Sequence, residues 1–138
     1  MLFRSERFFH RLPAAQDVTF AGALARDRLP ALFAHADALA WPGIGEAYGL
    51  AYLEAQASGL PVIGFRERGV VDVTIDRETA LLSETGDVKG LAASIQLLAS
   101  DASLLKAMGQ RARAFVAQER SLAAAGERLK SLLEGLRR

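Results

Sequence analysis

Short apolar runs bounded by turn residues recur through the first part of the chain and predict β-strands. They lie at 17–20, 36–41, 61–65 and 80–82. The second run is apolar enough to predict a buried strand, and Pro42 and Gly43 end it. The charged segment 66–69 follows the third run. We expect it to be a solvated loop.

Helical spacing of apolar residues fills most of the remaining chain. A first helix is predicted over 27–33 with Asp27 as its N-cap, and a second over 49–58 with Gly59 as its C-cap. Beyond Asp87 the spacing predicts three helices, the last of which carries Leu122, Leu129, Leu132, Leu133 and Leu136. The segment 70–75 is ambiguous, and a short helix is one interpretation.

Strands that alternate with helices predict an α/β fold with a doubly wound parallel sheet, because parallel strands need crossover connections. We divide the chain into an N-terminal remnant at 1–16, a partial Rossmann-like domain at 17–120 and a C-terminal helix at 121–138. The sheet is thin, and the first helix–strand unit of such a fold is absent. The opening residues MLFRS match what the end of a common sequencing adapter encodes. We therefore interpret 1–5 as a library scar on a truncated chain, with a genuine start as the alternative.

Composition narrows the class of protein. The 138 residues are 51% hydrophobic and 24% charged, which favours a packed domain over disorder. The 17 basic and 16 acidic residues are scattered, which argues against a nucleic-acid partner. Cysteine is absent from the sequence, so disulfides and thiolate metal sites are excluded. No apolar run approaches the roughly 18 residues of a membrane span, and we expect a cytoplasmic protein with no metal site.

A glycine-rich turn precedes the helix predicted at 49–58. Gly43, Gly45 and Gly49 give G-x-G-x-x-x-G, one residue longer than the dinucleotide fingerprint. The first turn of a helix past the carboxyl end of a strand favours phosphate. Glu54 lies about 7–8 Å further along the helix axis, roughly the span from a pyrophosphate to a ribose whose hydroxyls a carboxylate binds. The alternative is that the glycines only permit a tight turn and that Glu46 and Glu54 face solvent.

The segment HADALAWPGIGEAYGLAYLEAQASGLPVIGF, at 35–65, resembles the donor-binding segment of retaining, GT-B-fold glycosyltransferases of family 4. That family has a strand ending in proline, an E-x7-E pair, an aromatic-Gly-aliphatic step and an A-x-G-x-P-V-I strand. Here Pro42, Glu46 and Glu54 fall in register, as do Tyr48-Gly49-Leu50 and the segment 57–63. The resemblance covers nearly all of the chain after about Asp17.

The resemblance implies a role for each matched residue. Glu46 is expected to contact the donor sugar as the catalytic residue, and Glu54 the ribose. The N–H groups of Tyr48, Gly49 and Leu50 are expected to hold the pyrophosphate. The donor is a nucleotide-diphosphate sugar, and no cofactor or metal is implied.

The implied fold is the incomplete C-terminal half of a GT-B enzyme with a helical C-terminal tail. Its partner is the missing N-terminal acceptor domain, which lies upstream with the basic pair that neutralises the leaving diphosphate. The chain alone is therefore expected to be inactive, and membrane contact is expected to be at most peripheral, through the full-length enzyme. The alternative is a non-enzymatic nucleotide-binding or interaction module on the same fold, whose C-terminal leucines pair with another chain.

Overall fold

The computed structural model describes residues 18–19 and 21–136, which fall into two compact units that meet between Leu32 and Phe33 in the sequence. In the first unit, Val18 and Thr19 are not in a strand, and the other two residues of the strand predicted at 17–20 lie outside the described residues. A 3-10 turn, η2 (Arg26–Arg28), leads into helix α2 (Leu29–Phe33). The helix is confirmed, but the Asp27 cap is wrong. The turn begins one residue earlier, where the Arg28 N–H donates to the Ala25 carbonyl at 2.9 Å.

The second unit contains a parallel sheet of three strands in the order β1-β2-β3. They are β1 (Leu39–Trp41), β2 (Val62–Phe65) and β3 (Ala80–Ser83). The strands predicted at 36–41, 61–65 and 80–82 are thereby confirmed. The first is shorter than predicted. The prediction that it is buried is wrong, because β1 is the outer strand of the sheet and leaves Trp41 46% exposed.

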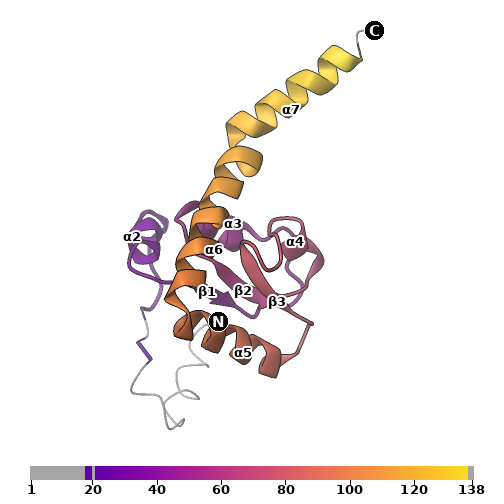
Figure 1. The fold of residues 1–138 in the computed structure, drawn as a ribbon. Helices are drawn as coiled ribbons and strands as arrows, with labels where there is room; N and C mark the ends of the chain where they lie inside the picture. The colour runs from indigo at the N-terminus through magenta and orange to yellow at the C-terminus, as the bar shows by residue number, and fades with distance from the viewer. Residues whose placement is uncertain (1–17, 20, 137–138) are drawn as a thin grey trace. The chain divides into compact units, whose positions relative to one another are not determined.

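Helices on both faces of the sheet make the fold doubly wound, as predicted (Figure 1). Helix α3 (Leu50–Ala57) connects β1 to β2, and α4 (Arg68–Val71) follows β2. Side chains alternate along β2, so Val62 packs in one core and Ile63 in the other. The first core also contains Tyr52, Ala55, Leu60, Val70, Val73 and Ala80. The second contains Phe65, Leu91, Leu98 and Met108.

Three further helices follow the sheet, as the spacing after Asp87 predicts. They are α5 (Val88–Ser100), α6 (Ala102–Phe115) and α7 (Leu122–Gly135). Asp87 and Asp101 cap the first two, each accepting a backbone N–H at 2.9 Å. Of the short helix considered for 70–75, only Val70 and Val71 are helical, as the end of α4, which begins at Arg68.

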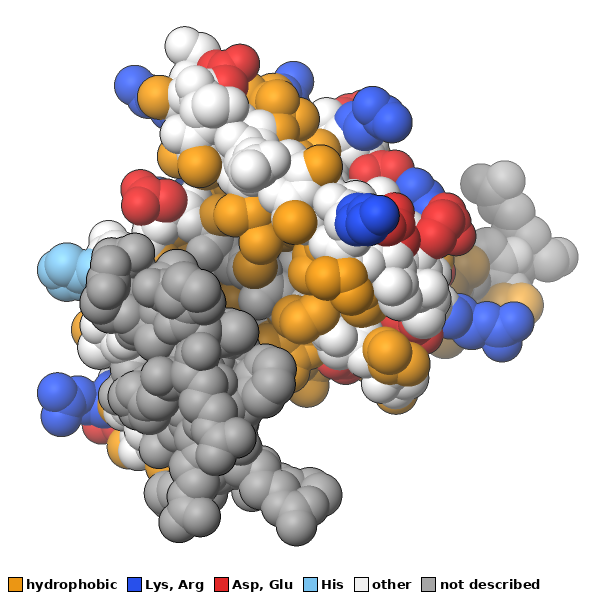
Figure 2. Space-filling model, turned by 90° about the horizontal axis from the view of Figure 1, so that it is seen from below, with side chains coloured by type: hydrophobic (Ala, Val, Ile, Leu, Met, Phe, Trp, Pro, Cys, Tyr) orange, Lys and Arg blue, Asp and Glu red, His pale blue; other side chains and the backbone are white. Residues whose placement is uncertain are grey.

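A π-helical turn, η3 (Val116–Arg120), joins α6 to α7. Arg120 donates to the Asp72 carbonyl at 2.6 Å and lies over the Phe115 ring, so it ties this turn to the end of α4. The predicted leucines of α7 are all exposed, from 53% at Leu133 to 94% at Leu122. Helix α5 also exposes Val88, Ile95 and Leu97, and the view from below shows hydrophobic side chains among charged ones (Figure 2). Within the described part of the chain, no helix is long and apolar enough to cross a membrane.

Candidate functional site

The segments that follow the three strands all leave the sheet at its carboxyl end, because the strands are parallel. One carboxylate connects them. The Gly45 N–H, after β1, donates to Oε2 of Glu67 at 3.4 Å. The Thr85 hydroxyl, after β3, donates to Oε1 of Glu67 at 2.7 Å. Glu67 itself follows β2, so it links the ends of all three strands.

The residues at 42–48, called the glycine loop below, lie directly on the first turn of α4. A Cβ added to Gly69 would be 2.5 Å from the Glu46 carbonyl oxygen and 2.6 Å from the Tyr48 nitrogen. Such contacts are too short for any side chain, so only glycine at 69 permits the loop to approach this closely. Gly49, which follows the loop, has a φ of 78° and would place a Cβ 2.8 Å from Val73. Glycine is therefore needed at position 49 both for the left-handed backbone conformation and to avoid overlap with Val73.

Tyr52 supports the same loop from the core. Its side chain is fully buried, and its hydroxyl donates to the Trp41 carbonyl, the last of β1, at 2.7 Å. Gly64 makes room for it, because a Cβ there would lie 2.5 Å from the tyrosine oxygen. Burial raises the pKa of Tyr52 to about 12, and the charges of Glu46 and Glu67 add to the effect. The hydroxyl thus remains a donor at neutral pH, with two carboxylates nearby.

The start of α3 already binds an anionic group. The Gly49 N–H donates to Oε1 of Glu46 at 3.1 Å. The first backbone bonds of the helix run from Tyr52 and Leu53 to the Gly49 carbonyl. The N–H groups of Leu50 and Ala51 therefore precede any helical acceptor and lie at the positive end of the helix dipole. Chemically, this helix end favours a negatively charged oxygen.

The structure brings four of the five sequence-predicted site residues together at the start of α3. Glu46 is half-buried, Gly49 is buried, and Tyr48 and Leu50 are each 58% exposed. The fifth, Glu54, is half-buried and lies four residues beyond Leu50 on the same helix, which corresponds to about 6 Å along the axis.

Sequence reasoning assigned no part in the site to Glu67, Gly69 or Tyr52. The interpretation of 66–69 as a solvated loop holds for Arg66, which is exposed, but it is wrong for Arg68 and Gly69, which begin helix α4, and Gly69 is buried. Glu67 lies before the helix and is half-buried, and both of its carboxylate oxygens accept hydrogen bonds. The sequence carries only a weak signal for this residue, namely an acid directly after a predicted buried strand.

Arg66 is paired beside this site. It forms ion pairs with Asp76 and, at 3.2 Å, with Glu84. Burial alone raises the pKa of Asp76, but the bonds from Arg66 and from the Leu82 N–H lower it overall. Asp76 is therefore ionised at neutral pH and holds the arginine against β3. In the residues that the structure describes, no three or more His, Cys, Asp or Glu side chains are grouped to hold a metal ion.

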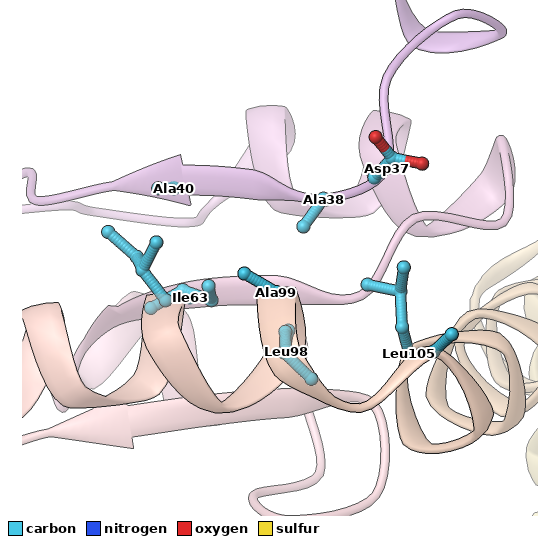
Figure 3. Close-up of a pocket in the computed structure, with 9 residues that line it drawn as sticks. Asp37, Ala38, Ala40, Ile63, Leu98, Ala99 and Leu105 are labelled. Atoms are coloured by element: carbon cyan, nitrogen blue, oxygen red, sulfur yellow. The ribbon is translucent and has the colours of Figure 1, made fainter.

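A separate cavity of about 510 Å³ lies between β1 and helices α5 and α6 (Figure 3). Its wall is mainly apolar, with Asp37 as its one acidic residue. The lining residues are Asp37, Ala38, Ala40, Ile63, Ile95, Leu98, Ala99, Ala102 and Leu105. None of the sequence-predicted site residues is among them, so this cavity is distinct from the start of α3.

The fold and site define a Rossmann-like α/β domain of the GT-B type. The structure of sucrose-phosphate synthase from Thermosynechococcus elongatus superposes with a TM-score of 0.85 at 28% identity, over 97% of this chain and 34% of that one. The structure of Anabaena HepE in complex with UDP has a TM-score of 0.85 at 21% identity, over 97% and 36%. Residues 3–115 match the family described as Glycosyl transferases group 1. The chain belongs to this family.

Two curated relatives show how much of such an enzyme the chain represents. The GDP-mannose-dependent alpha-(1-6)-phosphatidylinositol monomannoside mannosyltransferase of Mycolicibacterium smegmatis is 32% identical over 96% of this chain and 36% of its own length. The N-acetyl-alpha-D-glucosaminyl L-malate synthase of Bacillus anthracis is 36% identical over 68% and 25%. The chain thus spans about a third or less of the length of these relatives.

Proposed function

We propose that this chain binds a nucleotide-diphosphate sugar at the start of α3 and forms the donor half of a retaining glycosyltransferase. One observation carries the proposal. The Gly49 N–H at this helix end holds a carboxylate oxygen, at the edge of the sheet where parallel α/β folds bind ligands. A phosphate oxygen has the same charge and accepts the same hydrogen bond.

The sequence-predicted residues receive their roles at this position. The N–H groups of Tyr48, Gly49 and Leu50 hold the pyrophosphate, and Glu54 accepts the ribose hydroxyls. Since Glu46 Oε1 occupies the Gly49 N–H, a phosphate that takes this donor must replace it. The exchange releases the Glu46 carboxylate for the donor sugar, where it acts as the catalytic residue.

The comparisons support a nucleotide sugar as ligand. Structures of HepE are described in complex with UDP and with UDP-glucose, and a curated relative is named as GDP-mannose-dependent. Because these proteins are about three times as long as the matched region, we propose that the acceptor is bound by polypeptide outside these 138 residues. Sugar transfer then requires that polypeptide, and the chain alone binds donor without transferring it.

A second candidate is a non-enzymatic interaction module on the same fold. The observation that favours it is the exposure of the α7 leucines, including Leu122 at 94% and Leu136 at 83%. A module of this kind would associate through α7 and would not distinguish nucleoside diphosphates from other anions. The cytoplasmic location and the absence of a nucleic-acid partner stay predictions under either candidate.

Calorimetry with UDP and GDP tests the proposal. Glu54→Ala should weaken the affinity about 10-fold or more, because hydrogen bonds to a charged group are each worth about 1.5–3 kcal/mol. The matched control is Glu127→Ala, which removes an exposed glutamate from α7 and should leave the affinity unchanged. Equal effects of the two substitutions, or no binding of either nucleotide by the unmodified chain, would refute the donor-site assignment.

A further inference from the structure

We propose that Glu67 is a positioning residue, whose carboxylate fixes the tip of the glycine loop in the shape that receives the donor. The proposal rests on the proposed function for the identity of that ligand. Its structural part, that Glu67 sets the conformation of the loop, stands on contacts described above.

A long-range hydrogen bond reaches the tip of the glycine loop at Gly45. Gly45 has a φ of 76°, and a Cβ built on it meets nothing within 4 Å. No neighbouring atom therefore stands against this side of Gly45, whose left-handed conformation is one that glycine adopts readily. The Gly45 N–H donates to Glu67 Oε2 at 3.4 Å, across 22 residues of sequence. This bond connects the tip to the rest of the sheet edge.

Glu67 is itself held firmly. Its N–H donates to the Phe65 carbonyl at 2.8 Å, and its own carbonyl accepts the N–H groups of Val70 and Val71 at 3.0 Å each. The side chain is anchored at Oε1 by the Thr85 hydroxyl, at 2.7 Å. The backbone of Glu67 is thereby fixed between β2 and α4, and its carboxylate is anchored to the segment that follows β3.

The chemistry of the contact calls for a carboxylate. Both oxygens face donors, one an N–H and the other an O–H. An amide offers one acceptor oxygen, and its NH₂ group would face one of these donors without a lone pair to offer. A glutamine at 67 therefore loses at least one of the two bonds, although its shape is nearly the same.

The negative charge of Glu67 has an opposing effect that a test must separate. A carboxylate near a diphosphate repels it, so removal of the charge alone would tighten binding. Thr85→Ala removes the anchor and keeps the charge, whereas Thr85→Ser keeps the hydroxyl as well. Positioning and charge thus predict different outcomes for Thr85→Ala.

The single tryptophan of the sequence provides a readout of the loop that is independent of ligand. Trp41 ends β1 directly before the loop and is 46% exposed. The Cβ position of Gly43, within the loop, lies only 2.5 Å from the indole nitrogen. A change in loop conformation should therefore alter the fluorescence and the near-ultraviolet circular dichroism of Trp41.

The experiment compares Glu67→Gln, Thr85→Ala and Thr85→Ser in the full 138-residue chain, with Glu78→Gln as the exposed control. We expect Glu67→Gln and Thr85→Ala to change the Trp41 spectra and to weaken UDP and GDP binding about 5- to 20-fold, the effect of losing one or two hydrogen bonds. Thr85→Ser and Glu78→Gln should match the unmodified chain. If Glu67→Gln does not fold, Thr85→Ala and its rescue by serine decide the question.

Two results would overturn the proposal. One is an unchanged Trp41 spectrum in Thr85→Ala. The other is tighter nucleotide binding in Glu67→Gln together with unchanged binding in Thr85→Ala, which would assign Glu67 a purely electrostatic effect. Failure of the unmodified chain to bind UDP and GDP would refute the proposed function instead, and the Trp41 spectra would still decide whether Glu67 positions the loop.

Discussion

Gly69→Ala tests whether the glycine loop depends on its contact with α4. The added Cβ would lie 2.5 Å from the Glu46 carbonyl oxygen and 2.6 Å from both the Ala47 carbonyl carbon and the Tyr48 nitrogen. All three are backbone atoms, so no side-chain rotation relieves the overlap. Ordinary contact begins at 3.4 Å, so the loop must retreat by 3.4 − 2.5, or about 0.9 Å.

The magnitude follows from two opposing terms. Overpacking of this kind costs about 1–3 kcal/mol, while alanine in place of glycine in a helix returns up to about 1 kcal/mol. The free energy of unfolding should therefore fall by up to about 3 kcal/mol, with the larger values expected because only backbone movement relieves the overlap. The displaced loop should also weaken UDP and GDP binding, because the Tyr48 and Gly49 N–H groups move with it.

Urea denaturation followed by far-ultraviolet circular dichroism measures the stability, and calorimetry measures the binding. The control is Gly126→Ala in α7, where a Cβ meets nothing within 4 Å. It should not lower the free energy of unfolding and should leave binding unchanged. A Gly69→Ala chain that is as stable as the unmodified one and binds equally well would refute the argument that the loop is seated on residue 69.

Two further predictions concern stability. The pKa of Tyr52 is raised from 10.0 to about 12. Its contribution to the free energy of unfolding is therefore fully present below pH 10 and is lost as the pH rises through about 12. Two pKa units correspond to at most about 2.7 kcal/mol. The free energy of unfolding should therefore fall more steeply between pH 10 and 12 in the unmodified chain than in Tyr52→Phe. Urea denaturation at several pH values measures this, and an equal fall in the two chains would contradict the prediction. Asp101→Ala removes the acceptor of the Leu104 N–H at 2.9 Å and should cost about 0.5–2 kcal/mol in the same assay; an unchanged midpoint would show that the cap contributes nothing.

Much of the fold could be predicted because its determinants are local. The apolar runs that became β2 and β3 and the helical spacing after Asp87 lie within the elements that they define. The burial of β1 could not be predicted in this way. Whether an apolar strand lies inside a sheet or at its edge depends on its neighbours, and β1 pairs with β2 alone among the described strands.

The candidate site likewise has features that could be predicted from local sequence and contacts that could not. The start of α3 and its glycines could be predicted, because helix period and glycine spacing are local features of the sequence. The contacts of Glu67 could not, since they join residues 22 and 18 positions apart. The contact of Gly69 could not be predicted either, because it lies beneath a loop more than 20 residues earlier in the chain. Only the pairing of the strands brings Glu67, Gly69 and the glycine loop together at the carboxyl end of the sheet.

The bond between Glu46 and the Gly49 N–H changes how the proposed catalytic role must be tested. The carboxylate occupies a donor that we assign to the pyrophosphate, so Glu46 competes with the phosphate and is also proposed to contact the sugar. Removal of Glu46 therefore favours a nucleoside diphosphate, which gains an N–H group and loses a repulsive charge. The same removal deprives a nucleotide sugar of one of its contacts. Affinity for the nucleotide alone thus reports the competition, and only the difference between nucleotide and nucleotide-sugar affinity reports the contact with the sugar.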